Sequence, residues 1–416
     1  MLSLLYKSTI CIAFLLCLSW YGQTHFYRDP GSVFFDKTRA YEASYSAIRK
    51  AEAAMTIESL TNEASTQPDN ASSVNKTLCL ALNSVSRQTQ YLPITIGSIL
   101  NGLSGQERQD LNIYILIAET DPTRHPNWNE EWLKRAAENV YTYDDNTTMI
   151  RYLSELEKKH NYPEKGVIDY TLALEQCYGT DALYVGVFED DILLARGWFM
   201  RTLQGLADIM TIDPEQNWLF MRLFNQERST GWASHEIGGN HEFWIILGIG
   251  IGISAPALFA RRRWRAAQKY LDREILFAVV FILVPGLVIL VYQSGKASLF
   301  PPSPGVVTEP FGCCSQAMIF PRRQIPLLIS ELRRRKRGQI DLMLDDIAIG
   351  NGLDRYALYP VQAQHIGIDS ARKTTKDEAQ AVWSMAFENL DSEVLERENE
   401  RMISRYQSLR EKIYEG

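Results

Sequence analysis

Long apolar runs interrupt this chain and limit what it can fold into. The first covers Ser8 to Trp20, and two more cover Phe243 to Ala260 and Ile275 to Tyr292. Each of the later two has about 18 residues without a charged side chain, the lower end of what a helix needs to cross a bilayer. Buried core helices rarely lack charges over such a length. The sequence therefore predicts three membrane-spanning helices, the last two forming a hairpin.

The first apolar run is expected to stay in the mature protein. The bulky pair Trp20-Tyr21 stands where a signal peptide needs small residues before its cleavage site. We therefore interpret residues 1–22 as an uncleaved signal anchor, with a cleaved signal peptide as the alternative.

The loop of the hairpin indicates its orientation. Arg261 to Arg263, Arg265 and Lys269 fall in the stretch 261–273 between the two runs. Positively charged loops stay in the cytosol, so both ends of the hairpin are expected to face the lumen. An anchor with a short cytosolic tail places the chain from residue 23 onward on that same side.

Sequons and cysteines agree with a lumenal location. The acceptor triplets for N-linked glycans begin at Asn70, Asn75 and Asn146. Four cysteines fall in the predicted lumenal parts: Cys79, Cys177, Cys313 and Cys314. An oxidising compartment favours two disulfides among them. A bridge between the adjacent cysteines is strained, so we expect each to pair with Cys79 or Cys177, with the connectivity and free thiols left open.

Between the apolar runs, strand-like and helix-like segments alternate. Thr77 to Leu82, Leu111 to Ala118 and Ala182 to Phe188 read as buried strands, with helical patterns between them. Such alternation predicts an α/β fold with a mostly parallel sheet and helices on both faces. The hairpin interrupts this pattern, so it is expected to split one domain.

These signals divide the chain into six parts. They are an anchor (1–22), a stem (23–75), the first part of the folded domain (76–242), the membrane hairpin (243–292), the second part of the domain (293–370) and a charged helical tail (371–416). The tail carries one apolar stripe at helical spacing, Val382, Met385, Ala386, Leu390 and Val394. We expect this stripe to pack against the domain.

Three adjacent carboxylates follow the third buried strand. They are Glu189, Asp190 and Asp191. Ligands of α/β sheets bind beyond the carboxyl ends of the strands. Adjacent acids there attract a divalent cation, which can hold the diphosphate of a nucleotide sugar. We predict that Asp191 contacts the cation directly, with Glu189 and Asp190 on metal-bound water or the nucleotide ribose. A solvated acidic turn is the alternative.

Four further residues are candidates for the same site. Asp345 and Asp346 open an apolar segment, and one of them, Asp346 ahead of Asp345, is expected to be the general base. Capping of a helix is the alternative for this pair. His365 follows the last strand-like run and is predicted to complete the metal site together with Asp191 and Glu189, unless its role is structural. Arg87, after the first strand, is placed to reach a phosphate or the uracil, although a plain surface charge is as compatible with its position.

The acidic triplet, the segment Cys313-Cys-Ser-Gln-Ala-Met-Ile-Phe320 and the late His365-Ile-Gly367 resemble the post-GPI-attachment GalNAc transferases. The domain-splitting hairpin is the most specific part of this resemblance, which covers residues 76–370. It implies a multi-pass Golgi membrane enzyme of the GT-A fold with a lumenal catalytic domain. Such an enzyme transfers GalNAc from UDP-GalNAc, with inversion and with Mn²⁺ or Mg²⁺, to a core mannose of the GPI glycan. GPI-anchored proteins and the lipid bilayer would be its partners.

Other functions are less compatible with the residues. The net charge of -7 and the absence of a basic stripe argue against nucleic acid as a partner. Three apolar spans without internal charge offer a transporter no path for a substrate. Two alternatives stay open: an N-acetylglucosaminyltransferase of the same fold acting on N-glycans or another lipid-linked glycan, and a non-catalytic membrane receptor or chaperone for GPI-anchored proteins.

Overall fold

The computed structural model describes residues 2–62, 76–144, 146–226, 240–309, 314–367 and 380–415. It divides into two compact units. The membrane unit comprises Met1–Glu42 and Glu227–Pro302, and the sheet unit comprises Ala43–Gln226 and Ser303–Gly416. The sequons at Asn70 and Asn75, and Cys313, lie outside the described residues.

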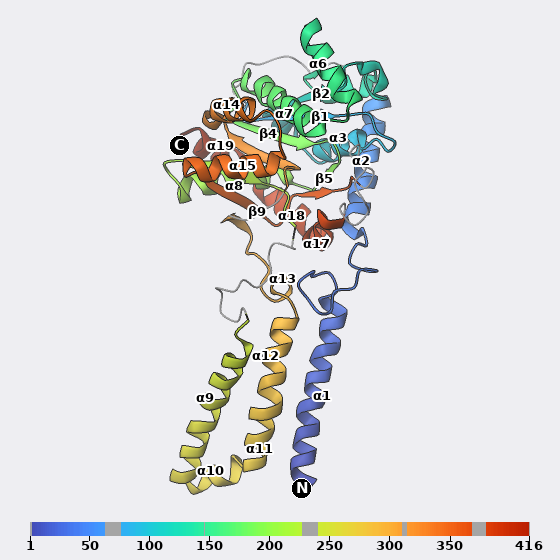
Figure 1. The fold of residues 1–416 in the computed structure, drawn as a ribbon. Helices are drawn as coiled ribbons and strands as arrows, with labels where there is room; N and C mark the ends of the chain where they lie inside the picture. The colour runs from blue at the N-terminus through green and yellow to red at the C-terminus, as the bar shows by residue number, and fades with distance from the viewer. Residues whose placement is uncertain are drawn as a thin grey trace. The chain divides into compact units, whose positions relative to one another are not determined.

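The membrane unit contains the three predicted apolar helices (Figure 1). They are α1 (Leu2–His25), α9 (Glu242–Arg263) and a third helix built from α11 (Arg273–Ala278), a π-helical turn (Val279–Leu283) and α12 (Val284–Gln293). The short helix α10 (Arg265–Tyr270) joins the second to the third. Spans of 23, 22 and 21 residues are long and apolar enough to cross a membrane, as the sequence predicted.

Polar contacts join α1 to the hairpin, and the loop after α1 to the short helix after the hairpin. At one end Lys7 forms an ion pair with Asp272 and lies 3.2 Å from the Glu274 carboxylate. At the other end Asp29 accepts a 2.7 Å hydrogen bond from the Ser298 amide, in the short helix α13 (Lys296–Leu299). The anchor and the hairpin therefore form one packed bundle rather than independent tethers.

The sheet unit is built around an eight-stranded sheet in the order β3-β2-β1-β4-β8-β6-β9-β7. The strands are β1 (Leu78–Ser84), β2 (Leu111–Ile117), β3 (Asn139–Tyr141), β4 (Tyr184–Glu189), β6 (Trp218–Arg222), β7 (Gly305–Thr308), β8 (Ala317–Pro321) and β9 (Asp354–Tyr359). Four of the pairings are parallel and three are antiparallel. The prediction of a mostly parallel α/β sheet is confirmed. A second, antiparallel pair joins β5 (Ile192–Leu194) to β10 (Ala363–His365).

Helices cover both faces of the sheet. One face packs against α3 (Leu92–Leu100), α5 (Glu131–Ala136), α8 (Trp198–Ile212) and α19 (Tyr406–Glu415). The other packs against α7 (Tyr162–Tyr178), α14 (Ile325–Arg335) and α15 (Ile340–Asn351). Two further helices are α4 (Gly105–Gln109), which contacts β2, and α6 (Thr147–Lys158), which contacts α7. Side chains alternate along each strand, so Leu80 joins the first core and Ala81 the second. This is why the strands read as continuous apolar runs.

One disulfide differs from the prediction. Cys79 on β1 is bonded to Cys177 on α7, with 5.6 Å between their Cα atoms. The expectation that each of them pairs with Cys313 or Cys314 is therefore wrong. Alternation along β1 turns Cys79 toward the face that α7 covers, which brings it opposite Cys177. Cys314 is disulfide-bonded as well.

The stretch assigned to a stem contributes a helix to the sheet unit. This helix, α2 (Ser44–Asn62), packs across α3, and the unit begins at Ala43. Arg49 is fully buried and donates through Nε to the Leu194 carbonyl at 2.8 Å and through Nη2 to the Ser98 carbonyl at 3.2 Å. A flexible spacer would not bury an arginine in this way.

The tail is helical, as expected, and also belongs to the sheet unit. Its helices are α17 (Met385–Glu388), α18 (Ser392–Ile403) and α19, which pack against α2 and α8. Met385 is buried, but Val394 is 41% exposed and its neighbour Leu395 is buried instead. The predicted stripe thus fails at its last member, because a new helix starts at Ser392 and shifts the helical phase.

Candidate functional site

The strand order identifies the edge of the sheet where a ligand is expected. Strands β1, β2 and β3 follow one another in one direction, whereas β4 lies on the opposite side of β1. The order therefore reverses between β1 and β4, which are parallel neighbours. A crevice forms at such a reversal beyond the carboxyl ends of the strands, and ligands of open α/β sheets bind there.

The acidic triplet lies at this reversal. Glu189 ends β4, Asp190 and Asp191 form the turn, and β5 starts at Ile192. On the other side of the crevice, β1 ends at Ser84. The chain therefore turns at the three carboxylates, between one apolar strand and the next.

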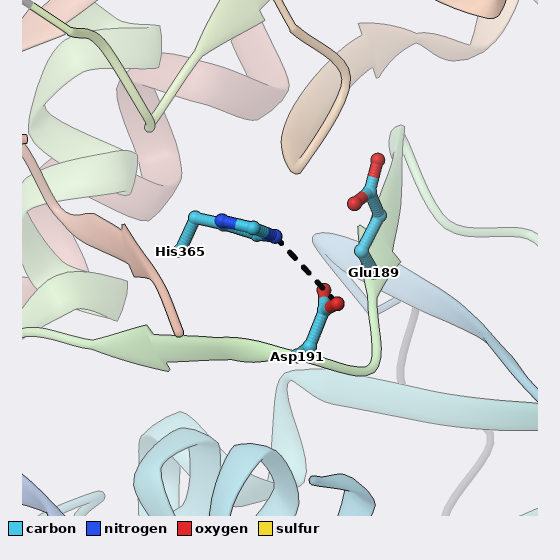
Figure 2. Close-up of side chains that lie close together, drawn as sticks. All are labelled: Glu189, Asp191 and His365. Atoms are coloured by element: carbon cyan, nitrogen blue, oxygen red, sulfur yellow. Dashed lines mark ion pairs between the residues drawn. The ribbon is translucent and has the colours of Figure 1, made fainter. Parts of the chain in front are cut away.

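Strand β10 brings a histidine to the same turn. It pairs with β5 so that His365 lies opposite Ile192, and the amide of Ile366 donates to the Asp191 carbonyl at 2.8 Å. His365 Nε2 lies 3.6 Å from Asp191 Oδ2. Figure 2 shows the imidazole pointing toward the Asp191 carboxylate, with Glu189 on the adjoining strand.

Glu189, Asp191 and His365 offer ligand atoms that all lie within 4.8 Å of one another. These are the three residues that the sequence predicted as metal ligands. Asp191 Oδ1 is buried and makes no hydrogen bond among the described residues. Two carboxylates and one imidazole are donors suited to a divalent metal such as Mn²⁺. The side chains therefore fit a cation.

Gly367 keeps this cluster open. A Cβ atom at this position would lie 2.1 Å from Asp191 Oδ2 and 2.9 Å from His365 Nε2. Any other residue would displace one of the two candidate ligands. The requirement for glycine here is thus imposed by the cluster itself.

Burial and neighbouring charges act on the two buried aspartates in opposite directions. Burial raises the pKa of Asp190 to about 7, and the Arg87 guanidinium offsets only part of that effect. Burial also opposes ionisation of Asp191, but His365 and Arg87 outweigh it and hold the pKa of that carboxyl well below its ordinary value. Burial lowers the pKa of His365, and the Asp191 carboxylate raises it above its ordinary value. Asp191 is therefore the aspartate that stays ionised, as a cation ligand must.

Arg87 reaches the aspartates from the loop after β1. Its Nη1 donates to Asp191 Oδ2 at 2.8 Å, and its Nη2 forms an ion pair with Asp190. Asp190 also accepts a 2.5 Å hydrogen bond from Ser84 Oγ, which lies 3.0 Å from His125 Nε2. The structure thus brings Arg87 and the acidic triplet together and gives Asp190 a supporting role behind Asp191.

A cavity of about 640 Å³ opens at this edge of the sheet, within the usual size of a ligand pocket. The acidic triplet, Arg87 and His365 all line it. Three other lining residues have a buried polar atom that makes no hydrogen bond among the described residues: Asn83 Oδ1, Tyr170 Oη and Gln316 Oε1. Buried polar groups are nearly always paired, so these atoms indicate a polar ligand or ordered water.

The cavity also contains residues that sequence reasoning missed. Lys165 Nζ donates to Asp169 Oδ2 at 2.9 Å and to the Ala118 carbonyl at 2.7 Å. Tyr143 donates to Asp169 Oδ1 at 2.7 Å. The spacing of Lys165 and Asp169, one helical turn apart, was the available signal. Ser315, which also lines the cavity, donates through Oγ to Glu189 Oε1 at 3.0 Å.

The structure does not bring the second acidic pair into this cavity. Both residues lie in the middle of α15, so neither caps its first turn. Asp345 lies 3.1 Å from Arg222 and 3.2 Å from Arg355. Asp346 is an exposed surface residue 3.1 Å from Arg335. Asp341, one turn before Asp345, does line the cavity.

Comparison with protein families identifies the class. The family model described as GPI-N-acetylgalactosamine transferase PGAP4 matches residues 78–362. The match covers more than half of the chain, so the chain belongs to this family and is a glycosyltransferase. A search of curated proteins gives no match. The matched segment includes Arg87 and the acidic triplet but ends before His365.

Proposed function

We propose that this chain transfers N-acetylgalactosamine from UDP-GalNAc to a core mannose of the GPI glycan on GPI-anchored proteins, with inversion. The cluster of Glu189, Asp191 and His365 at the strand reversal carries the proposal. A divalent cation, Mn²⁺ or Mg²⁺, held by these residues would neutralise the leaving diphosphate. Family membership supports the sugar and the acceptor class.

The other residues of the cavity suit a nucleotide sugar. Arg87 presents a guanidinium beside the two aspartates, where a phosphate oxygen of the donor can replace one of its carboxylate partners. Ser315 restricts the Glu189 carboxylate through its hydrogen bond. We assign the general base to Asp341, because it lines the cavity whereas Asp345 is engaged by two arginines and Asp346 lies on the surface.

The proposal is tested in cells that lack the transferase for the GPI side branch. We expect expression of the wild type to add one HexNAc to the released GPI glycans, detected by mass spectrometry. Asp191→Ala should abolish the addition. Asp181→Ala changes an exposed aspartate just before β4 and serves as the matched control. No added HexNAc, or HexNAc that persists in Asp191→Ala, would contradict the proposal.

Assays with purified protein test the donor sugar, the stereochemistry and the metal dependence separately. UDP-GalNAc and UDP-GlcNAc are compared as donors, and the anomeric configuration of the product is read by NMR. Removal of divalent cations by EDTA should stop transfer, and Mn²⁺ or Mg²⁺ should restore it. Preference for UDP-GlcNAc would favour the alternative N-acetylglucosaminyltransferase. Transfer that continues in EDTA would exclude the cation from the mechanism.

A further inference from the structure

Strand β10 has a buried polar residue directly beside the candidate ligand His365. Adjacent residues of a strand point to opposite faces, so Gln364 points away from the cation cluster. It is fully buried. Gln364 Nε2 donates to the Ser384 carbonyl at 2.8 Å and to Glu388 Oε1 at 2.9 Å, and Gln364 Oε1 accepts from the Ser384 amide at 2.9 Å. Strand β10 is thus fastened to the tail at the residue beside the ligand.

The Glu388 carboxylate extends this network to α2. Glu388 Oε2 accepts a 3.1 Å hydrogen bond from the Ser46 amide, and Oε1 accepts from the Ser46 hydroxyl. Ser46 is fully buried and Glu388 is 3% exposed. One buried carboxylate therefore joins α2, α17 and β10, three segments that are far apart in the sequence.

A small apolar core supports the network. It includes Tyr45 of α2 and Phe387 of α17, whose ring centroids lie 5.1 Å apart, and Leu193 of β5. The Tyr45 hydroxyl accepts from the Arg196 amide at 3.0 Å, just after β5. Leu193 follows Asp191 by two residues and Ile366, which directly follows His365, belongs to the same core, so both candidate ligands adjoin residues that pack in it.

We propose that Glu388, through Ser46 and Gln364, is a positioning residue that holds β10 where His365 can bind the cation beside Asp191. The inference rests on the proposed function, since it takes the cluster to be a metal site. It assigns a role to α2 and to the tail, both of which lie outside the segment matched by the family model. Partners that orient metal ligands from behind typically change metal affinity by about 10- to 100-fold.

Glu388→Gln is the informative change, because it keeps the shape of the side chain. The carboxylate accepts from Ser46 and Gln364 through both oxygens. In the variant, an amide NH₂ group replaces one of the two oxygens. In one orientation this group faces the Ser46 amide, and in the other it faces Gln364 Nε2, so two hydrogen-bond donors meet in either case. Gln364 cannot turn over to relieve this, because its own oxygen is used by Ser384. We expect β10 to shift in this variant.

The test uses the full-length protein in detergent, with Mn²⁺ alone as the probe. Electron paramagnetic resonance gives the dissociation constant, and spin-echo modulation from a directly bound ¹⁴N reports the His365 imidazole. We expect Glu388→Gln to bind Mn²⁺ at least about ten-fold more weakly and to lose the nitrogen signal, as His365→Gln does. Glu393→Gln, an exposed residue of α18, should change neither. A thermal melt shows the folded fraction, so that affinity is compared per folded molecule.

The outcomes separate the inference from the proposed function. If the wild type binds no Mn²⁺, or if His365→Gln leaves the nitrogen signal unchanged, the metal site itself is refuted. If the wild type shows the signal and Glu388→Gln shows it equally, with the same affinity, the positioning role is overturned. Should Glu388→Gln fail to fold, Ser46→Ala, which removes a single donor, decides by the same two readouts, with about three-fold weaker binding expected.

Discussion

At the scale of single residues, Asp341 is the carboxylate that we propose as the general base. It lies in the first turn of α15 and lines the cavity, whereas Asp345 and Asp346 lie a turn or more further along the helix. In a helix, residues four positions apart share a face. Asp345 is therefore on the same face of α15 as Asp341, where it pairs with Arg222 and Arg355.

We therefore predict that Asp341→Asn lowers kcat by about 10²- to 10⁴-fold, the usual contribution of a general base. Asp345→Asn should instead lower thermal stability, because it leaves the buried Arg222 with one carboxylate partner fewer. Steady-state kinetics and a thermal melt of each purified variant make the comparison. If Asp346→Asn shows the loss of kcat instead, Asp346 is the base, as the sequence first indicated.

The buried side chain of His125 leads to a prediction of how the free energy of unfolding depends on pH. Burial, together with the positive charge of Arg87, lowers its pKa to about 4. The unfolded chain takes up this proton near pH 6.5 and the folded protein only near pH 4, so the free energy of unfolding falls as the pH drops through that window. From about pH 7.5 to about pH 5 the loss amounts to about 2 kcal/mol.

Asp190 acts in the opposite direction over the same range, because burial raises its pKa to about 7. The effect of His125 is therefore measured as the difference in unfolding free energy between the wild type and His125→Gln. We expect the variant to lose about 2 kcal/mol less than the wild type on acidification. Equal pH dependence of the two proteins would mean that His125 has the same pKa in the folded and the unfolded state.

At the scale of elements, the crossing of α2 and α3 shows that α2 belongs to the folded unit. A Cβ atom at Gly97 of α3 would lie 2.3 Å from the Ala53 carbonyl oxygen of α2, a backbone atom that cannot move alone. The two helices approach this closely only because Gly97 lacks a side chain.

We predict that Gly97→Ala destabilises the protein by about 2 kcal/mol or more, even though alanine favours a helix by about 1 kcal/mol over glycine. For a unit of about 300 residues, the melting temperature should fall by about 3 °C or more. Gly105→Ala is the control, because no atom lies within 4 Å of its added Cβ. Unchanged melting of Gly97→Ala would mean that α2 is a detachable stem.

The core strands and the acidic turn were predictable from the sequence, because local patterns specify them. Continuous apolar runs identified β1, β2 and β4, and the carboxylates that end β4 marked the ligand edge. The role of α2 was not predictable, since its buried Arg49 reads as a surface charge until its distant partner Leu194 is known. Asp341 was missed because α15 begins without a side-chain capping hydrogen bond, so the sequence carries no clear signal for the start of this helix.

At the scale of the whole molecule, orientation in the membrane is the property to test. Asn146 is exposed and caps α6 through its side-chain oxygen, which accepts from the amides of Thr148 and Met149. This use of the oxygen leaves the amide nitrogen available for a glycan.

We predict that Asn146 carries an N-linked glycan and that the basic loop of the hairpin is cytosolic. Deglycosylation should increase the gel mobility of the wild type more than that of Asn146→Gln. The difference should correspond to the mass of one glycan. A cysteine introduced at the exposed Ala266 of α10 should react with an impermeant maleimide added from the cytosolic side of permeabilised cells. Labelling only from the lumenal side would mean that the loop is lumenal, which contradicts the predicted orientation.

The order of strands in the sheet has a consequence for how the protein is made. Strand β8 pairs with both β4 and β6, yet it is synthesised after the hairpin. While the ribosome is still producing the hairpin, the edges of β4 and β6 remain open, and such edges invite misassembly. Because β8 follows the hairpin in the chain, the sheet closes only after the hairpin has been synthesised. If only one of the two hairpin helices entered the bilayer, β8 and His365 would lie on the other side of the membrane from β4 and β6, and the sheet could not close.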